Sequence, residues 1–154
     1  MNNLMKNKRG LVMGVANDKS IGWGIAKAIS DQGGELAFTY QGEALKKRVV
    51  PLANSLNSKI VIPCDVLNDK DIDNTFNELK KIWPKIDFLV HAIAFSDKDE
   101  LKGEYIDTSR ENFINTMDIS VYSFTAIARR ASSMMPDGGS LLTLSYYGAE
   151  KVMP

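Results

Sequence analysis

Short apolar runs recur along the chain at regular intervals. Each run is nearly continuous in hydrophobic residues and does not alternate strictly between apolar and polar positions. Such continuity is typical of strands that are covered on both faces, as in a parallel sheet. We therefore predict five strands, at residues 10–15, 35–40, 59–66, 87–94 and 140–145.

The four segments between these runs are predicted to be helices. The second, residues 42–56, contains Pro51, which we expect to kink or split it. The fourth runs from about residue 109 to residue 134, and the sequence PDGG at 136–139 predicts its end. In the first, third and fourth helical patterns, apolar residues repeat at helical spacing and are predicted to face inward. They are Ile21, Ile25, Ala28 and Ile29 in the first helix, Ile72, Phe76, Leu79 and Ile82 in the third, and Phe113, Met117, Val121, Phe124 and Ile127 in the fourth.

Strands and helices thus alternate along the whole chain. This order predicts an α/β fold, a Rossmann-like doubly wound parallel sheet with right-handed crossovers. We find no internal linker, repeat or low-complexity stretch, so we expect residues 1–154 to form one domain. In such folds ligands bind in the crevice outside the carboxyl ends of the strands, and every motif described below falls there.

The composition argues against several classes of function. Lys plus Arg and Asp plus Glu number 19 each, so no net charge draws the chain toward nucleic acid or anionic lipid. One cysteine, Cys64, and one histidine, His91, leave no disulfide framework and no multi-cysteine or multi-histidine metal site. No apolar run approaches the roughly 20 residues of a membrane span, and the N-terminus lacks the apolar region of a secretory signal. We expect a soluble, cytoplasmic protein that binds no metal.

A glycine-rich loop, GVANDKSIGWG at 14–24, joins the first strand to the first helix. Gly14 permits a tight turn, while Gly22 and Gly24 allow backbone to approach a ligand or the neighbouring strand. Ser20 is placed to cap the helix and leave its first amides facing a pyrophosphate. The spacing is not GxGxxG, and a purely structural turn is the alternative. The position after the first strand favours a dinucleotide-binding domain.

The ends of the second and third strands offer polar groups for the adenosine part of a dinucleotide. Gln41 stands where such sites often hold an acid that binds ribose, and it would not repel a 2′-phosphate as an acid would. The basic residues of the next helix (Lys46, Lys47 and Arg48) would reach such a phosphate, or simply form a solvated face. We favour NADH over NADPH.

Asp65 follows the third strand and is a candidate acceptor for the adenine amino group, with Val66 packing on the ring; the alternative for Asp65 is a helix cap. We interpret Cys64 as an inert core thiol. At the end of the fourth strand, the small residues Ala92 and Ala94 would let a cofactor approach the backbone. His91 is interpreted as a structural histidine and not a catalyst, since no partner acid is evident nearby.

Six segments together resemble the short-chain dehydrogenase/reductase superfamily, and within it the bacterial NADH-dependent enoyl-acyl-carrier-protein reductases. They are GVANDKSIGWGIAKA, ELAFTYQ, CDV, HAIAFS, DISVYSF and LLTLSYYGAEKVMP, in order and at family spacing over nearly the whole chain. Ordinary superfamily members carry TGxxxGxG and NNAG, and this chain has neither. The longer loop ending in Ser-Ile and the His-Ala-Ile-Ala run are the features that separate the enoyl reductase branch.

The resemblance implies reduction, by NADH, of the 2,3 double bond of an acyl chain held on acyl carrier protein, in a cytoplasmic homotetramer. The residues that match family contacts are Gly14, Ser20 and Ile21 for pyrophosphate and ribose, Gln41 for the adenosine ribose, Asp65 and Val66 for adenine, Ile93 for the nicotinamide ribose, Ser96 for substrate and Tyr146 as an active-site tyrosine. Many relatives have Gly where this chain has Ala94, a departure that would narrow the pocket.

The family's catalytic tyrosine and lysine, in a Tyr-x6-Lys arrangement, are expected to begin two residues after Pro154. Lys151 has the wrong spacing from Tyr146 or Tyr147 to substitute. We therefore expect the domain to be incomplete at its C-terminus, with further strands to follow and the fifth strand as an exposed edge. Two alternatives for the chain as given are a non-catalytic dinucleotide-binding sensor and an inert fragment.

Overall fold

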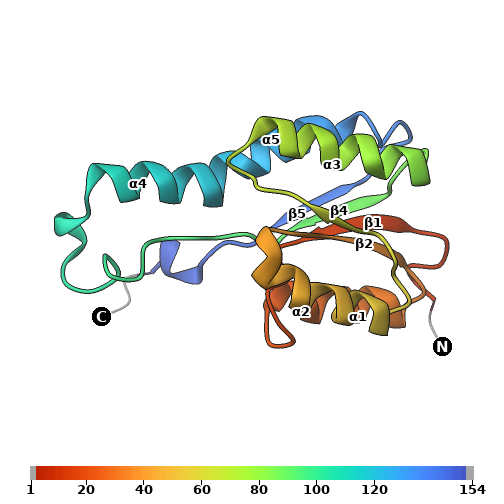
Figure 1. The fold of residues 1–154 in the computed structure, drawn as a ribbon, viewed down its shortest axis with the longest axis horizontal. Helices are drawn as coiled ribbons and strands as arrows, with labels where there is room; N and C mark the ends of the chain where they lie inside the picture. The colour runs from red at the N-terminus through yellow and green to blue at the C-terminus, as the bar shows by residue number, and fades with distance from the viewer. Residues whose placement is uncertain (1–2, 152–154) are drawn as a thin grey trace.

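A computed structural model describes residues 3–151 and contains a five-stranded, fully parallel sheet flanked by helices (Figure 1). The strand order is β3-β2-β1-β4-β5, which confirms the predicted doubly wound α/β fold. The elements are β1 (Arg9–Met13), α1 (Ile21–Asp31), β2 (Glu35–Tyr40), α2 (Gly42–Ser55), β3 (Val61–Pro63), α3 (Asp69–Ile82), β4 (Phe88–His91), η1 (Tyr105–Asp107), α4 (Arg110–Met117), η2 (Asp118–Tyr122), α5 (Ser123–Ser132), β5 (Ser140–Thr143) and η3 (Tyr147–Ala149). No helix within residues 3–151 is long and apolar enough to cross a membrane.

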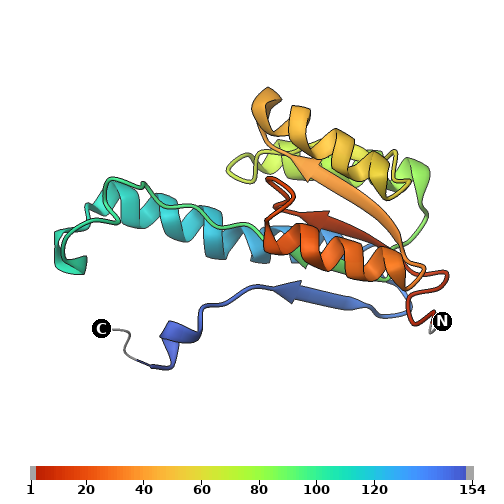
Figure 2. The same ribbon diagram turned by 90° about the horizontal axis from the view of Figure 1, so that it is seen from below.

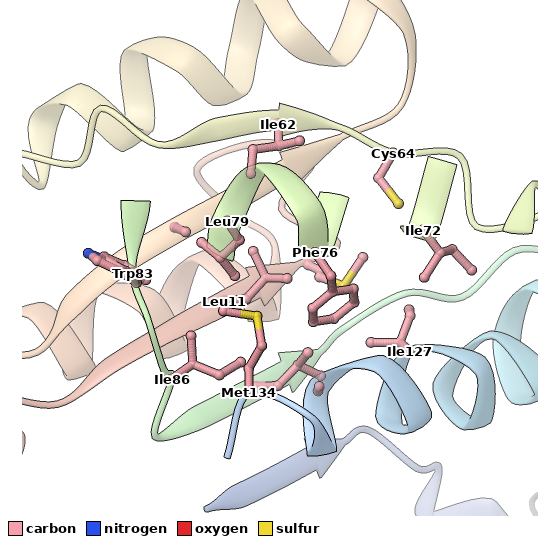
Figure 3. Packing of buried hydrophobic residues seen from close by; sticks show 14 of the residues in the cluster. Leu11, Ile62, Cys64, Ile72, Phe76, Leu79, Trp83, Ile86, Ile127 and Met134 are labelled. Carbon is pink, nitrogen blue, oxygen red and sulfur yellow. The ribbon is translucent and has the colours of Figure 1, made fainter. Parts of the chain in front are cut away.

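Two hydrophobic clusters sandwich the sheet. Helices α1 and α2 cover one face, and α3 and α5 cover the other (Figure 1). Leu11 and Met13 belong to the cluster beneath α3 and α5, whereas Val12 between them belongs to the cluster beneath α1 and α2. Figure 3 shows the first cluster, where Phe76 of α3 and Ile127 of α5 lie over the sheet. The strands are apolar on both sides because both sides are covered.

The fourth predicted helix forms, but it is divided. The π-helical turn η2 separates α4 from α5 without interrupting the helical path. Ile127 is fully buried as predicted, but Phe113, Met117 and Val121 are 47%, 42% and 52% exposed, so their predicted inward orientation is wrong. Figure 2 shows the reason, since α4 extends past the end of the sheet that α5 packs on.

The other helices also differ in detail from the sequence pattern. In α1 Trp23 and Ala26 are buried, and Ile25 and Ile29 pack on the same cluster as predicted. Ile21 is 68% exposed and Ala28 is exposed as well, contrary to the prediction. Similarly, Ile82 at the end of α3 is exposed. Pro51 lies within one uninterrupted helix, so it does not split α2. The residue one turn earlier, Lys47, is exposed, and water can therefore bind the carbonyl that Pro51 leaves without a donor.

Strand β5 is the outermost strand of the sheet within the described residues. It pairs only with β4 there, and its side chains are exposed, including Leu141 and Leu142 at 38% and 42%. The predicted exposed edge is therefore confirmed for residues 3–151. The last three residues of the segment LLTLSYYGAEKVMP lie outside the described residues.

Candidate functional site

The carboxyl ends of β1 to β4 surround a cavity of about 420 Å³. The strand order reverses between β1 and β4, and this is the position at which doubly wound sheets bind ligands. The cavity is lined by residues from the strand ends, from the loops that follow them, from α2 and from the helical path at α4 and η2. They are Gly14, Val15, Ala16, Thr39, Tyr40, Gln41, Leu45, Cys64, Asp65, Val66, Leu67, Ala92, Ile93, Ala94, Phe95, Asn115 and Ile119.

Gly14 makes the tight turn that begins the site. Its φ is +93°, a conformation that favours glycine, and a Cβ atom there would lie 2.0 Å from the carbonyl oxygen of Ala92. At Gly22 a Cβ would lie 3.2 Å from that of Ala92, so this glycine also brings α1 close to the β4 exit. Gly24 differs, because a Cβ there would meet nothing within 4 Å. The tight turn predicted at Gly14 is thus confirmed, and of the two glycines predicted to allow a close approach Gly22 faces the neighbouring strand whereas Gly24 does not.

The side chain of Ser20 closes the loop and does not cap the helix. Its hydroxyl donates to the carbonyl of Asn17 (2.6 Å) and accepts a long hydrogen bond from the amide of Ala16 (3.4 Å). Ser20 is the N-cap residue of α1, as predicted, but its side chain makes no cap hydrogen bond. The reason is geometric, since the hydroxyl turns back toward the five-residue loop before it. The first turn of α1 is left without a side-chain cap, and Ile21 is exposed beside it.

Gln41 and Asp65 meet at the opposite side of the cavity. The Gln41 amide donates to one carboxylate oxygen of Asp65 (3.1 Å), and the other oxygen accepts from the Leu67 amide (3.0 Å). Val66 is half-buried against the hydrophobic core. The helix cap that Asp65 was alternatively expected to provide comes from Asn68, whose side chain accepts from the Lys70 amide. Asp65 is therefore free of that role and faces the cavity.

Lys46 lies on α2, the helix that follows Gln41. Its ammonium pairs with Glu43 (3.0 Å) and stands 5.9 Å from the centre of the Tyr40 ring. The hydrogen bond to Glu43 and its charge raise the pKa of Lys46. The lysine is thus partly neutralised by an acid of its own helix, in agreement with a solvated helix face.

The segment after β4 forms the wall of the cavity on the side of α4. Ile93, Ala94 and Phe95 line the cavity, whereas Ser96 lies just beyond it. The Ser96 hydroxyl accepts from the side-chain amide of Asn112 (3.1 Å) and from the Thr116 hydroxyl (3.0 Å). Ser96 is therefore held by α4 next to the cavity and is not one of its lining residues.

His91 is a structural histidine, as predicted. Ser123 donates its one hydroxyl proton to the carbonyl of Ile119 (2.6 Å), so Nε2 of His91 must be the donor in the 2.7 Å bond to Ser123. Nδ1 then accepts from the Thr143 hydroxyl (3.1 Å). Burial lowers the pKa of His91, which favours this neutral form. Similarly, Cys64 is a buried thiol whose pKa is raised by burial, as expected of an inert core residue.

Tyr146 is not among the cavity-lining residues. It lies in the loop after β5 and is 83% exposed, and its neighbour Tyr147 has the Lys151 ammonium 5.5 Å from its ring centre. The sequence did not point to Asn115 and Ile119, which do line the cavity. Only the docking of the helical path against the β4 exit places them there. Within residues 3–151, no group of three or more His, Cys, Asp or Glu side chains is arranged to hold a metal ion.

Comparisons with known proteins show which family the chain resembles. A family model described as enoyl-(acyl carrier protein) reductase matches residues 14–154. Two enoyl-(acyl-carrier-protein) reductases (NADH) of Rhizobium meliloti are 64% and 59% identical over 98% and 100% of this chain, which covers 56% and 58% of their lengths.

Solved structures of similar proteins have the same fold. FabI from Candidatus Liberibacter asiaticus superposes with a TM-score of 0.98 at 53% identity, over 100% of this chain and 60% of that one. The enoyl-acyl-carrier-protein reductase of Anaplasma phagocytophilum, in complex with NAD, gives 0.94 at 59% identity, over 98% and 58%. The chain thus spans somewhat more than half the length of these relatives. Because the family model matches residues 14–154, which is most of the chain, this chain belongs to the enoyl-(acyl carrier protein) reductase family.

Proposed function

We propose that residues 1–154 are the dinucleotide-binding domain of an NADH-dependent enoyl-acyl-carrier-protein reductase of fatty acid synthesis. The single observation that carries the proposal is the cavity at the strand-order reversal, bounded by Gly14 on one side and by the Gln41–Asp65 pair on the other. In a chain of this family, that arrangement suits a dinucleotide laid across the carboxyl ends of the strands.

The residues present fit such a cofactor. The backbone at Gly14 occupies a turn in which a Cβ has no room, and the uncapped first turn of α1 presents amides and a positive dipole end to a pyrophosphate. Ser20 and Ile21 stand at this turn and are assigned to the pyrophosphate and its ribose. Gln41 is assigned to the adenosine ribose, and Asp65 to the adenine amino group.

Two further assignments concern the remaining ends of the cofactor. Val66, half-buried beside the cavity, would pack on the adenine ring, and the backbone at Ile93 would lie along the nicotinamide ribose. NADH is favoured over NADPH because Gln41 carries no positive charge and Lys46 is already paired with Glu43.

The substrate side involves Ser96 and Tyr146. NADH, when bound, would supply a hydride to the β-carbon of the enoyl thioester, and a proton taken up at the α-carbon would complete the reduction. Ser96, fixed beside the cavity by α4, is assigned to substrate contact. The Tyr146 hydroxyl is assigned to the active-site wall, where a donor stabilises the negative charge that develops on the thioester oxygen. The substrate is accordingly an acyl carrier protein that bears an enoyl chain, and we assign the protein to the cytoplasm as a homotetramer.

The test measures whether the full-length gene product oxidises NADH in the presence of a crotonyl thioester. The reaction is monitored as the loss of NADH absorbance. We expect saturable turnover, faster with NADH than with NADPH, and none with the saturated butyryl thioester. Saturable NADH binding without turnover would overturn the reductase in favour of a dinucleotide sensor. An absence of NADH binding would overturn both.

A further inference from the structure

A stripe of polar side chains runs along α4 and η2. Asn112, Thr116 and Ser120 are spaced four residues apart, so they lie on one side of the helical path. Each makes a hydrogen bond to the segment that leaves β4. The side-chain oxygen of Asn112 accepts from the backbone amide of Asp97 (3.0 Å), and the Thr116 hydroxyl donates to the Ser96 hydroxyl (3.0 Å). The stripe therefore fastens residues 95–97 to the helix.

Ser120 makes the most specific of these contacts. Its hydroxyl accepts from the amide of Phe95 (3.1 Å) and donates to the carbonyl of the same residue (3.2 Å). One side chain thus satisfies both backbone groups of a residue that belongs to neither a strand nor a helix. A hydroxyl with one donor and two acceptor sites suits this role, and alanine would leave both backbone groups without these partners.

The helix geometry supports this contact. Ser120 lies within the π-helical turn Asp118–Tyr122, and such turns are rare and are frequently found at functional sites. Three residues later, Ser123 is buried and binds His91 at the end of β4. The turn and the first residue of α5 therefore each direct a hydroxyl at the same stretch of chain, Ser123 at the strand end and Ser120 at the loop that follows it.

The opposite side of that stretch is the cavity wall. Ala94 and Phe95 line the cavity, together with Asn115 and Ile119 from the helical path that carries the stripe. Any loosening of the Phe95 backbone would move the wall on the side away from Gln41 and Asp65. The adenosine side would not be affected, because its contacts come from the ends of β2 and β3.

We propose that Ser120 is a positioning residue that holds the wall formed by residues 93–95 in place for the nicotinamide half of the cofactor. This inference rests on the proposed function, since it assumes that the cavity binds NADH. Ser120 touches neither cofactor nor substrate in this role and acts through the backbone of Phe95.

The experiment measures NADH and ADP binding to the full-length gene product by calorimetry. ADP is the probe for the adenosine and pyrophosphate side alone. Ser120→Ala is expected to weaken NADH binding by about three- to tenfold, the effect of losing hydrogen bonds of ordinary strength, and to leave ADP binding unchanged. Ser120→Thr retains the hydroxyl and is expected to restore NADH affinity. Ser132→Ala is the matched control, because that exposed serine bonds only the Arg129 carbonyl of its own helix.

Equal weakening of NADH and ADP by Ser120→Ala would overturn the inference, as it would indicate a general loss of structure. Unchanged NADH affinity would overturn it as well. If the alanine variant is too unstable to assay, Ser120→Cys gives the same comparison, since a thiol of similar size makes weaker hydrogen bonds. Wild-type protein that binds ADP but not NADH, or neither, would instead overturn the proposed function itself.

Discussion

The side-chain amide of Gln41 donates a 3.1 Å hydrogen bond to Asp65, a residue 24 positions further along the chain. The bond joins the carboxyl ends of two neighbouring parallel strands, β2 and β3, at the rim of the cavity. Each residue orients the other, and the second oxygen of Asp65 is fixed by the amide of Leu67. The adenosine side of the proposed site is thus organised before a ligand arrives.

Asp65→Ala is expected to weaken NADH binding by about tenfold or more, since a hydrogen bond to a charged group contributes about 1.5–3 kcal/mol. Reduced nicotinamide mononucleotide, which lacks adenosine, should bind as before. Asp65→Asn is the matched variant, because its side-chain oxygen can still accept from the Leu67 amide. Its loss of NADH affinity should be smaller than that of Asp65→Ala. A comparable loss for the mononucleotide would contradict the assignment of Asp65 to the adenosine side. Titration calorimetry on the full-length gene product measures all three.

Gly14→Ala and Gly24→Ala should have opposite effects on stability. At Gly14 the added methyl would meet the Ala92 carbonyl at 2.0 Å and the backbone has φ +93°, so the variant should unfold or lose several kcal/mol. At Gly24 nothing lies within 4 Å and the residue is helical, so alanine should stabilise by about 0.5–1 kcal/mol. Denaturant unfolding compares them. Similar destabilisation by both would contradict the described geometry of the loop.

His91 should make stability depend on pH. Its pKa in the folded state is lowered by burial, so between that value and the ordinary value of about 6.5 the unfolded state binds more protons. Its contribution is therefore fully present above about pH 6.5 and is lost as the pH falls toward the lowered pKa. His91→Asn does not titrate, and its free energy of unfolding should change less over the same range. Equal slopes for the two proteins would show that His91 is not the group responsible.

Arg130 connects α5 to α3. Its guanidinium contacts Asp73 (2.8 Å) and Asp69 (2.9 Å), and its side chain is only 14% exposed. Arg130→Lys keeps the charge but loses the planar fork, so the free energy of unfolding should fall by about 1 kcal/mol. Lys81→Ala removes an exposed pair with Glu78 and is the control, with an expected change within about 0.5 kcal/mol. Thermal and denaturant unfolding measure both, and equal effects would contradict a special role for Arg130.

Local pattern predicted the sheet well and the helix faces less well. The strands were recognisable because residues such as Leu11 and Val12 are apolar on both faces of a covered sheet, and this is visible in sequence alone. The buried face of α4 was not recognisable from the sequence. The spacing shows that Phe113 and Met117 share a side of a helix, but it does not show whether another element packs against that side. The sequence also did not show whether the Ser20 hydroxyl would bond a backbone amide of α1 or the carbonyl of Asn17 in the preceding loop.

The sequence by itself determined the α/β order of elements, the glycine turn and the family, because these depend on short segments whose meaning does not change with their surroundings. It also placed Gly14, Gln41, Asp65, Val66 and Ile93 at strand ends, and parallel strands end at one edge of the sheet. Only the tertiary structure decided that Gln41 and Asp65 bond to each other, that Ser123 fixes the tautomer of His91, and that the π-turn directs Ser120 at Phe95. These contacts join residues far apart in the chain, and their geometry depends on how helices dock on the sheet, which no local pattern encodes.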